Sequence, residues 1–312
     1  MRVFVAGATG AIGSPLVASL IRRGHEVIGT TRSVERARAL KAGGATATLM
    51  DALDPVAVKD AVAEAEPDVI VHELTAIPPE FNPRRFDQAF AQTNRLRTEG
   101  TDHLIAAAEA VAVRRFVTQS FAAWPYARRG SWVKTEDDPL DDDPPAQVRR
   151  TVDAIRYLER ATLDGPFDGL ALRYGGFYGP GSGLERTGPI ADSVRRRRFP
   201  IVGSGEGVWS FIHLIDAADA TALAVERGAP GVYNVTDDEP APVRDWLPAF
   251  ADAIGAPPPR HAPAWLGRLF AGELGVTMMT ELRGASNEKA KRELGWELRY
   301  PSWRQGFRDG LD

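Results

Sequence analysis

Three glycines that follow a short apolar run constrain the fold of this chain more than any other feature. Residues 3–6 read Val-Phe-Val-Ala, a run typical of a buried strand, and glycines follow at the spacing G-x-x-G-x-x-G before a helical stretch at 14–23. In such a unit glycine permits a tight turn and lets the backbone approach a pyrophosphate, while the positive end of the helix attracts phosphate. The motif therefore predicts a dinucleotide-binding loop made of Gly7, Ala8, Thr9, Gly10, Ala11, Ile12 and Gly13.

The residues about 20 positions after this loop indicate which dinucleotide binds. A carboxylate at that place holds the ribose 2′-hydroxyl of NAD, but the chain reads Thr30-Thr31-Arg32-Ser33 there. Arg32, with Ser33 and with Arg36 one turn later, pairs well with a 2′-phosphate. We therefore expect NADP(H), with NAD(H) as the alternative, and we expect Asp51 to accept from the adenine amino group.

Strand-like and helical segments alternate through the first 120 residues. The expected strands are Val3–Ala6, Val27–Thr30, Thr46–Met50, Val69–Val71 and Phe116–Thr118, and later ones are Leu170–Tyr174 and Gly231–Val235. This alternation predicts an α/β fold with a doubly wound parallel sheet, the Rossmann fold, and a small C-terminal substrate cap. We expect residues 1–175 and 211–236 to form the nucleotide-binding part, and 176–210 and 237–312 to form mainly the cap.

Two further segments carry clear patterns. Residues 86–112 form one long periodic stretch, and a second helix is expected at 147–163. Between them, residues 136–145 read EDDPLDDDPP, which we interpret as a solvated, proline-broken loop.

Composition excludes several classes of protein. Lys and Arg number 38 against 42 Asp and Glu, so there is no basic field to hold nucleic acid or an anionic membrane. Cysteine is absent, and the five histidines show no metal spacing, so we expect neither a metal site nor disulfides. The strand-like start leaves no room for a signal peptide, and we expect a cytoplasmic protein.

A series of motifs in order resembles the extended short-chain dehydrogenases/reductases, the NAD-dependent epimerase/dehydratase group. These motifs are the glycine loop, Met50-Asp51, Val69–His72, Asn94, Phe116–Ser120, Leu172–Pro180, Phe211–His213, Tyr233–Val235 and Lys291–Trp296. The resemblance implies a sheet of about seven strands with nicotinamide over its carboxyl edge. It also implies further cofactor contacts at Ala52, Leu74, Thr75, Ala76, Asn94, Thr118, Gln119, Ser120, Tyr174 and Gly176, and a homodimer as one oligomeric state.

The chain departs from this family at its proton relay. Such enzymes use a Tyr-x-x-x-Lys pair, in which lysine lowers the pKa of the tyrosine, and no tyrosine here is followed by lysine at that spacing. Counting back from Glu159 places Thr151 where the tyrosine stands in the family and Ile155 where the lysine stands. The groups that could act instead are Ser120, Tyr126, Thr151, Tyr157 and Glu73, the last because burial can raise a carboxyl pKa.

Two other departures concern the substrate. Gly176 and Trp209 stand where sugar-nucleotide members resemble one another in carrying an Asn and an Arg for the substrate diphosphate. Without those donors a nucleotide sugar is disfavoured, and the aromatic side chains expected near the pocket suit an apolar small molecule. These are Phe121, Trp124, Phe177 and Trp209.

Three functions remain open from the sequence. The first is an NADP(H)-dependent oxidoreductase that acts on a fairly apolar small molecule by a non-standard proton relay. The second is a non-catalytic NADP-binding sensor or scaffold, and the third is an epimerase or dehydratase with internal hydride return. Fold alone does not separate them.

Overall fold

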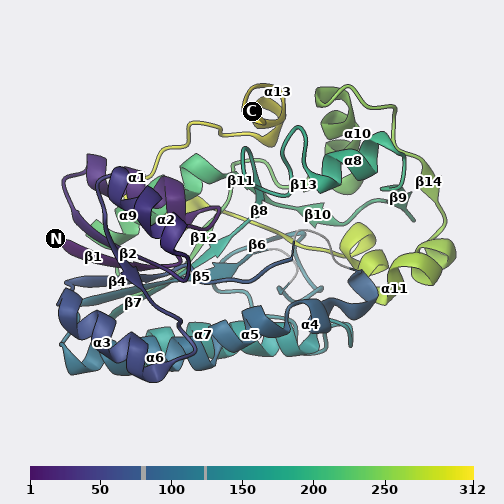
Figure 1. Ribbon diagram of the computed structural model, residues 1–312. Coiled ribbons are helices and arrows are strands. Elements are labelled where there is room, and N and C mark those ends of the chain that lie inside the picture. The colour runs from purple at the N-terminus through teal and green to yellow at the C-terminus, as the bar shows by residue number, and fades with distance from the viewer. Residues whose placement is uncertain (79–81, 123–124) are drawn as a thin grey trace.

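The computed structural model describes residues 1–78, 82–122 and 125–312. Its centre is a sheet of seven parallel strands in the order β12-β7-β5-β4-β1-β2-β3 (Figure 1). In chain order the strands are β1 (Arg2–Ala6), β2 (Glu26–Thr31), β3 (Thr46–Leu49), β4 (Val69–His72), β5 (Arg115–Phe121), β7 (Asp168–Tyr174) and β12 (Gly231–Val235). All seven expected strands lie in this sheet, which confirms the predicted α/β doubly wound fold.

Helices cover both faces of the sheet (Figure 1). One face carries α1 (Gly13–Arg22), α2 (Val34–Ala42) and α9 (Leu214–Glu226), and the other carries α3 (Pro55–Ala65), α6 (Glu99–Ala110) and α7 (Arg149–Asp164). Successive strand residues alternate between two separate apolar cores, as a two-sided sheet requires. Asp54 begins α3 by accepting from the amides of Val56 and Ala57, the cap that Asp54-Pro55 indicates.

The long periodic stretch at 86–112 is not one helix, contrary to the prediction. After η1 (Pro83–Arg85) it forms α4 (Phe86–Ala89), α5 (Ala91–Arg97) and α6. Thr98 leaves helical geometry at φ −105° and ψ −82°, and its hydroxyl donates to the carbonyl of Asn94 at 3.0 Å. Such side-chain to backbone bonds compete with the helix, which turns here while its apolar periodicity continues.

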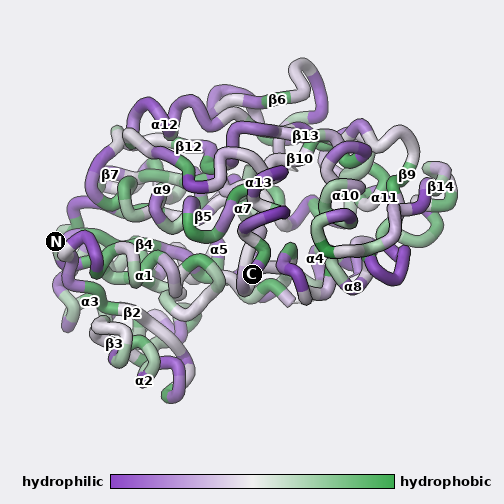
Figure 2. The backbone as a smooth tube through the Cα atoms, turned by 90° about the horizontal axis from the view of Figure 1, so that it is seen from above, coloured by the Kyte–Doolittle hydropathy of each residue, from purple (hydrophilic) through white to green (hydrophobic). Residues whose placement is uncertain are grey.

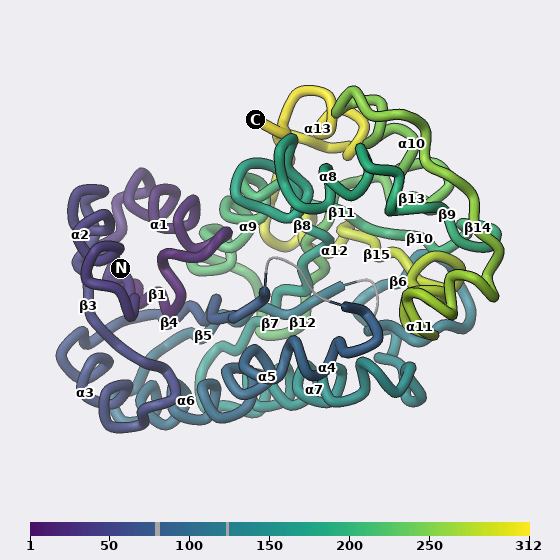
Figure 3. The backbone as a smooth tube through the Cα atoms, turned by 45° about the vertical axis from the view of Figure 1, so that its right-hand side comes forward, coloured from purple at the N-terminus to yellow at the C-terminus, as the bar shows by residue number. Residues whose placement is uncertain are grey.

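The remaining elements form a second layer beside the carboxyl edge of the sheet (Figure 3). Short strand pairs join β8 (Gly176–Tyr178) to β11 (Phe211–His213), β10 (Val208–Trp209) to β13 (Ala241–Pro242), β9 (Ile201–Val202) to β14 (His261–Ala262), and β6 (Val133–Lys134) to β15 (Gly284–Ala285). The helices of this layer are α8 (Pro189–Arg195), α10 (Val243–Ala253), α11 (Ala264–Thr280) and α13 (Trp303–Asp309), whereas α12 (Glu288–Leu294) packs against α9 and β12 of the main sheet. A separate apolar core around Trp246 and Phe250 stabilises this layer.

Seen from above, the sheet with its helices and this second layer lie side by side, with β9, β14 and α10 far from the N-terminus (Figure 2). β11 pairs with β8, whereas α9 and β12 return to the main sheet. The exact division of the chain into two domains stays a prediction. In the described ranges, no helix has the length and apolarity needed to span a bilayer.

Candidate active site and cofactor cradle

The glycine loop joins β1 to α1 with almost no room for side chains. Gly7 has φ +95°, and a Cβ atom there would lie 2.7 Å from the carbonyl oxygen of Glu73. A Cβ atom on Gly13 would lie 2.1 Å from the carbonyl oxygen of Gly7, while the amide of Gly10 donates to that same oxygen at 3.0 Å. Glycine is therefore required at both close approaches, as in a loop that brings its backbone onto a pyrophosphate.

A pocket of about 450 Å³ opens directly on this loop. Thr9, Gly10 and Ala11 line one side, and residues 180–181 and 213–215 line the other. The first turns of α1 and α9 both border it, and His213 accepts from the amide of Ile215 at the start of α9. The exposed backbone of Gly10 and Ala11 at the N-terminus of a ten-residue helix suits a dinucleotide phosphate.

Beyond the loop, β2 ends at the residues predicted to select the cofactor. The guanidinium groups of Arg32 and Arg36 are exposed, and within the described ranges neither forms an ion pair or a hydrogen bond. The hydroxyl of Ser33 accepts from the amide of Arg36 at 3.3 Å, so it caps α2. Asp51 accepts from the amide of Leu53 through one carboxylate oxygen at 3.0 Å. This corner therefore presents free cations and a helix N-terminus.

The other expected cofactor contacts lie along the carboxyl edge of the sheet. The segment after β4 is tied to α5, because the amide of Ala76 donates to the hydroxyl of Thr93 at 3.0 Å. His72 has a fully engaged ring: its Nδ1 accepts from the amide of Leu74, and its Nε2 contacts Thr101 and the carbonyl of Leu96. The edge also includes the other predicted contacts Ala52, Thr75, Thr118, Gln119, Ser120, Tyr174 and Gly176.

Ser120 and Tyr126 belong to one buried ion-pair network. The hydroxyl of Ser120 donates to Glu159 at 2.5 Å, and Glu159 pairs with Arg173 at 2.6 Å. Arg173 also donates to the hydroxyl of Tyr126, which donates to Asn234 at 2.6 Å. Burial raises the pKa of Tyr126 to about 12. Both hydroxyls therefore serve a network that joins β5, α7, β7 and β12.

The two relay positions on α7 hold no ionisable group. The hydroxyl of Thr151 donates to Asp87 at 2.6 Å, and the same carboxylate accepts from the amides of Arg150 and Thr151, so Asp87 caps α7. Asn94 donates to the Thr151 hydroxyl at 3.0 Å. Ile155 is fully buried in an apolar cluster. Thr151 therefore takes part in capping α7, and Ile155 takes part in packing.

Tyr157 points to another part of the molecule. Its hydroxyl donates to Asp102 on α6 at 2.5 Å, near the protein surface, and this hydrogen bond is the main cause that raises its pKa. The described residues thus place Tyr157 between α6 and α7.

Glu73 directly follows β4 and is only 3% exposed. Its Oε1 accepts from the hydroxyl of Tyr174 at 2.9 Å, and that hydroxyl also lies 2.6 Å from Thr221 on α9. Its Oε2 is buried and has no partner among the described residues. Burial raises the pKa of Glu73 to about 8, so this carboxyl is protonated at neutral pH. A protonated acid therefore lies beneath the glycine loop.

The expected aromatic pocket is spread over both layers. Phe177 packs against Tyr174 with ring centroids 5.3 Å apart, and Phe121 packs beside the cluster that contains Ile155. Trp209 donates from its indole to the carbonyl of Met278 at 2.8 Å and packs against Trp246. Trp124 lies outside the described residues.

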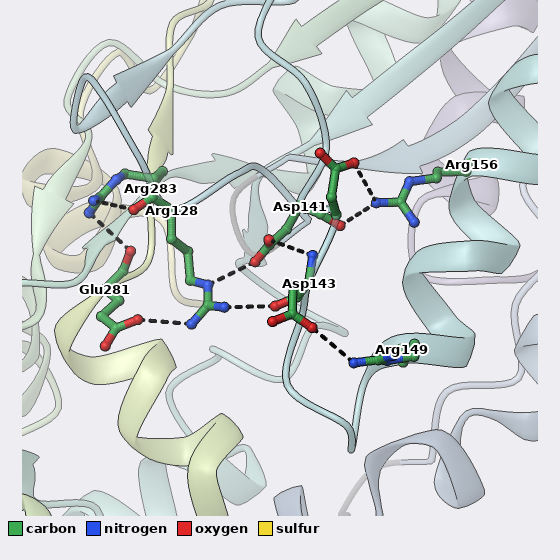
Figure 4. Close-up of polar contacts among 8 residues, drawn as sticks. Arg128, Asp141, Asp143, Arg149, Arg156, Glu281 and Arg283 are labelled. Carbon is green, nitrogen blue, oxygen red and sulfur yellow. Dashed lines mark hydrogen bonds and ion pairs between the residues drawn. The ribbon is translucent and has the colours of Figure 1, made fainter.

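The acidic loop is not simply solvated, contrary to our interpretation. Arg128 joins its Asp141 to Glu281 at the end of α11 and also donates to the carbonyl of Asp143 (Figure 4). Glu136 accepts from the amide of Asn234 at 2.7 Å. Because these partners come from distant segments, the local acidic pattern could not reveal them.

The sequence analysis also missed Arg97, the last residue of α5. Its side chain is almost fully buried, and its Nη1 has no partner in the described part of the chain. The sequence did offer one indication of its inward position. Arg97 follows Asn94 by three residues, and residues at that spacing lie on the same face of a helix. Among the described residues, no group of three His, Cys, Asp or Glu side chains could hold a metal ion.

Comparisons with known proteins agree with this geometry. Residues 3–236 match the family model of the NAD dependent epimerase/dehydratase family. A 3-diazoavenalumate denitrifying reductase from a Streptomyces species is 46% identical over 314 residues, which cover 98% of this chain and 99% of that protein. A 2-alkyl-3-oxoalkanoate reductase from Stenotrophomonas maltophilia is 27% identical, with coverage of 97% and 91%.

Solved structures show the same fold. The UDP-glucose 4-epimerase of Thermus thermophilus in complex with NAD aligns with a TM-score of 0.75 and 24% identity, covering 100% of this chain and 98% of that chain. A human epimerase family protein with NADPH aligns with a TM-score of 0.75 and 21% identity, covering 100% of this chain and 99% of that chain. These two neighbours bind NAD and NADPH, and the match to the family model supports a nicotinamide cofactor here. With the glycine cradle and the family match over residues 3–236, this chain belongs to the NAD-dependent epimerase/dehydratase family.

Proposed function

We propose that this protein is an NADP(H)-dependent reductase that acts on a small, fairly apolar aromatic molecule. The observation that carries the proposal is the state of the two relay positions on α7. The hydroxyl of Thr151 is bonded to the capping carboxylate of Asp87, and Ile155 is part of an apolar cluster. A reaction suited to this site needs hydride transfer and little help from a protein acid.

The cofactor proposal rests on both ends of the cradle. Gly7 and Gly13 permit the tight loop whose backbone would approach a pyrophosphate, and Arg32 and Arg36 offer two guanidinium groups that have no partner among the described residues. A 2′-phosphate would pair with these cations, whereas the carboxylate that holds the 2′-hydroxyl of NAD at the end of the second strand is replaced here by Thr31 and Arg32. When bound, the reduced nicotinamide supplies a hydride.

The substrate proposal combines this chemistry with the 46% identical reductase. Reducing a ketone puts a proton on oxygen as well as a hydride on carbon. Replacing a diazonium group on an aromatic ring needs only the hydride, because Ar–N₂⁺ and a hydride give Ar–H and N₂. A diazo-substituted aromatic compound is therefore the first substrate class to test on a site with no tyrosine–lysine pair.

Epimerisation of a nucleotide sugar has less support. The indole of Trp209 is already bonded to the carbonyl of Met278, and Gly176 has no side chain. Neither position offers a donor to a diphosphate. A non-catalytic NADP-binding sensor stays the main alternative, because the missing relay also fits it, and homodimer formation and a cytoplasmic location stay predictions.

One experiment separates these functions. The purified protein is titrated with NADPH, NADP⁺, NADH and NAD⁺, and is then incubated with NADPH and 3-diazoavenalumate while NADPH oxidation and N₂ release are followed. The proposal predicts tighter binding of NADPH than of NADH, a loss of that preference in Arg32→Ala, and one N₂ per NADPH oxidised. Arg38→Ala, which removes an exposed arginine of the following helix α2, is the control.

Two outcomes overturn the proposal. If the protein binds NADPH tightly but oxidises it neither with diazo compounds nor with a panel of aromatic carbonyl compounds, it is an NADP-binding sensor. If NAD⁺ stays bound through purification and Arg32→Ala does not change its affinity, the protein is instead an epimerase or dehydratase with internal hydride return.

A further inference from the structure

Arg97 is a buried cation that has no counter-ion among the described residues. Its side chain is 6% exposed, and within the described ranges it forms no hydrogen bond and no ion pair. Burial lowers the pKa of this guanidinium only to about 10, so it stays charged at neutral pH. Removing a charge from water without a partner is strongly unfavourable, so such a group is expected to meet an anion in a bound complex.

The carboxylates on the elements around Arg97 already have other partners. On α4, Asp87 accepts from two amides and the hydroxyl at the start of α7. The others are engaged as follows: Glu99 with Arg95, Asp102 with Tyr157, Asp153 with Arg156, and Glu159 with Arg173. The titratable group that faces Arg97 from the sheet is His72, whose pKa falls to about 4 through burial with a contribution from Arg97. The described residues on these elements therefore supply no anion to Arg97.

Arg97 lies close to the carboxyl end of β4. It ends α5, next to Leu96, whose carbonyl oxygen contacts the ring of His72 at the carboxyl end of β4. Thr118 lies opposite His72 in the sheet, and its hydroxyl is fully buried with no partner among the described residues. In doubly wound sheets, ligands bind at this carboxyl edge. α5 and α7 run together beneath that edge (Figures 1 and 3).

The phosphates of the dinucleotide have their own places. The glycine loop and α1 belong to the opposite face of the sheet, and Arg32 follows β2, two strands away from β4. α5, which ends at Arg97, packs against α6 and α7 on the other face (Figure 1). The second anion of the complex therefore comes from the other reactant.

We propose that Arg97 binds the carboxylate of the substrate, so that the reductase acts on a small aromatic acid. This inference rests on the proposed function, because it takes the small molecule at this edge to be the substrate. A guanidinium group binds a carboxylate through two parallel hydrogen bonds, which also orients the aromatic ring that carries the acid.

The test measures binding without turnover. The dissociation constants of 4-hydroxycinnamate and its methyl ester are determined by calorimetry on the NADP⁺-loaded protein, for the wild type, Arg97→Gln, Arg97→Lys and Arg95→Gln. Arg95 is an exposed neighbour on the same helix, bonded to Glu99, and serves as the matched control. NADPH affinity is measured for each variant.

We expect the wild type and Arg95→Gln to bind the acid at least tenfold more tightly than the ester. Arg97→Gln is expected to bind both within about twofold, and Arg97→Lys to keep part of the preference. NADPH affinity should be unchanged, and Arg97→Gln without ligand should unfold at the same temperature as the wild type or a higher one, because it removes an unpaired charge.

Either of two results overturns the inference. Equal affinity of the wild type for acid and ester does so without any variant. A tenfold loss of NADPH affinity in Arg97→Gln, with the acid preference retained, assigns Arg97 to the cofactor instead. Failure of diazo reduction refutes the proposed reaction but leaves this acid–ester comparison intact, so the two failures are distinguishable.

Discussion

Replacing Glu73 by glutamine should change how the stability of this protein depends on pH. Glutamine has the shape of a protonated glutamate and can still accept from the hydroxyl of Tyr174. The substitution therefore removes the titration of one buried group and leaves its contacts in place.

The magnitude follows from the difference between the folded and unfolded pKa values. The folded protein holds the proton of Glu73 up to about pH 8, whereas the unfolded chain releases it near 4.5. Between these limits the folded state binds more protons, so the free energy of unfolding of the wild type falls as pH rises. Each pH unit corresponds to about 1.4 kcal/mol, so the loss between pH 5 and pH 8 is about 4 kcal/mol at most.

The assay is urea unfolding of wild type and Glu73→Gln at half-unit steps from pH 5 to pH 8.5. The difference in the free energy of unfolding should grow with pH in favour of the variant and level off above about pH 8. Glu64→Gln, an exposed position on α3, should show no such trend. A Glu73→Gln difference that stays constant within about 0.5 kcal/mol from pH 5 to pH 8 would refute the protonated state of Glu73.

Three further outcomes test other parts of the account. Gly13→Ala should weaken NADPH binding more than tenfold in a fluorescence titration, because its Cβ atom would lie 2.1 Å from the carbonyl oxygen of Gly7. Gly10→Ala, whose Cβ atom would lie 3.3 Å from the same oxygen, should weaken binding less. Equal losses of affinity in the two variants would contradict the account of the glycine loop. Arg173→Ala leaves Glu159 buried without its cation and should cost about 3 to 5 kcal/mol in urea unfolding, against almost nothing for the exposed Arg160→Ala; a loss below 1 kcal/mol would argue against the network. Arg128→Ala should destabilise the protein by about 1 kcal/mol at low salt and by less in 1 M NaCl, because this arginine is partly exposed; Arg129→Ala is the control, and an effect that does not depend on salt would contradict an electrostatic link.

Local patterns predicted the sheet strands and the glycine loop. The β-branched runs predicted all seven strands, and Asp54-Pro55 predicted the start of α3, because these signals act within a few residues. The glycine spacing likewise predicted a tight loop whose close approaches the structure contains.

Contacts between distant segments lay beyond such patterns. Glu73 bonds to Tyr174, 101 residues later, and Arg128 bonds to Glu281, 153 residues later. The break at Thr98 depends on a side-chain to backbone bond that the apolar period of residues 86–112 does not reveal. Arg97 was overlooked because arginine is rarely buried, so the sequence pattern places it on the exposed face of the helix. Its burial is for the same reason an indication of function.

Transfer of deuterium from cofactor to product tests the central claim most directly. The protein is incubated with NADPH deuterated at C4 of the nicotinamide and with 3-diazoavenalumate, and the product is analysed by mass spectrometry and NMR. The account predicts a product in which deuterium from one face of C4 replaces the diazo group on the ring. A product without deuterium, or NADPH that stays unoxidised although it is bound, would contradict the account.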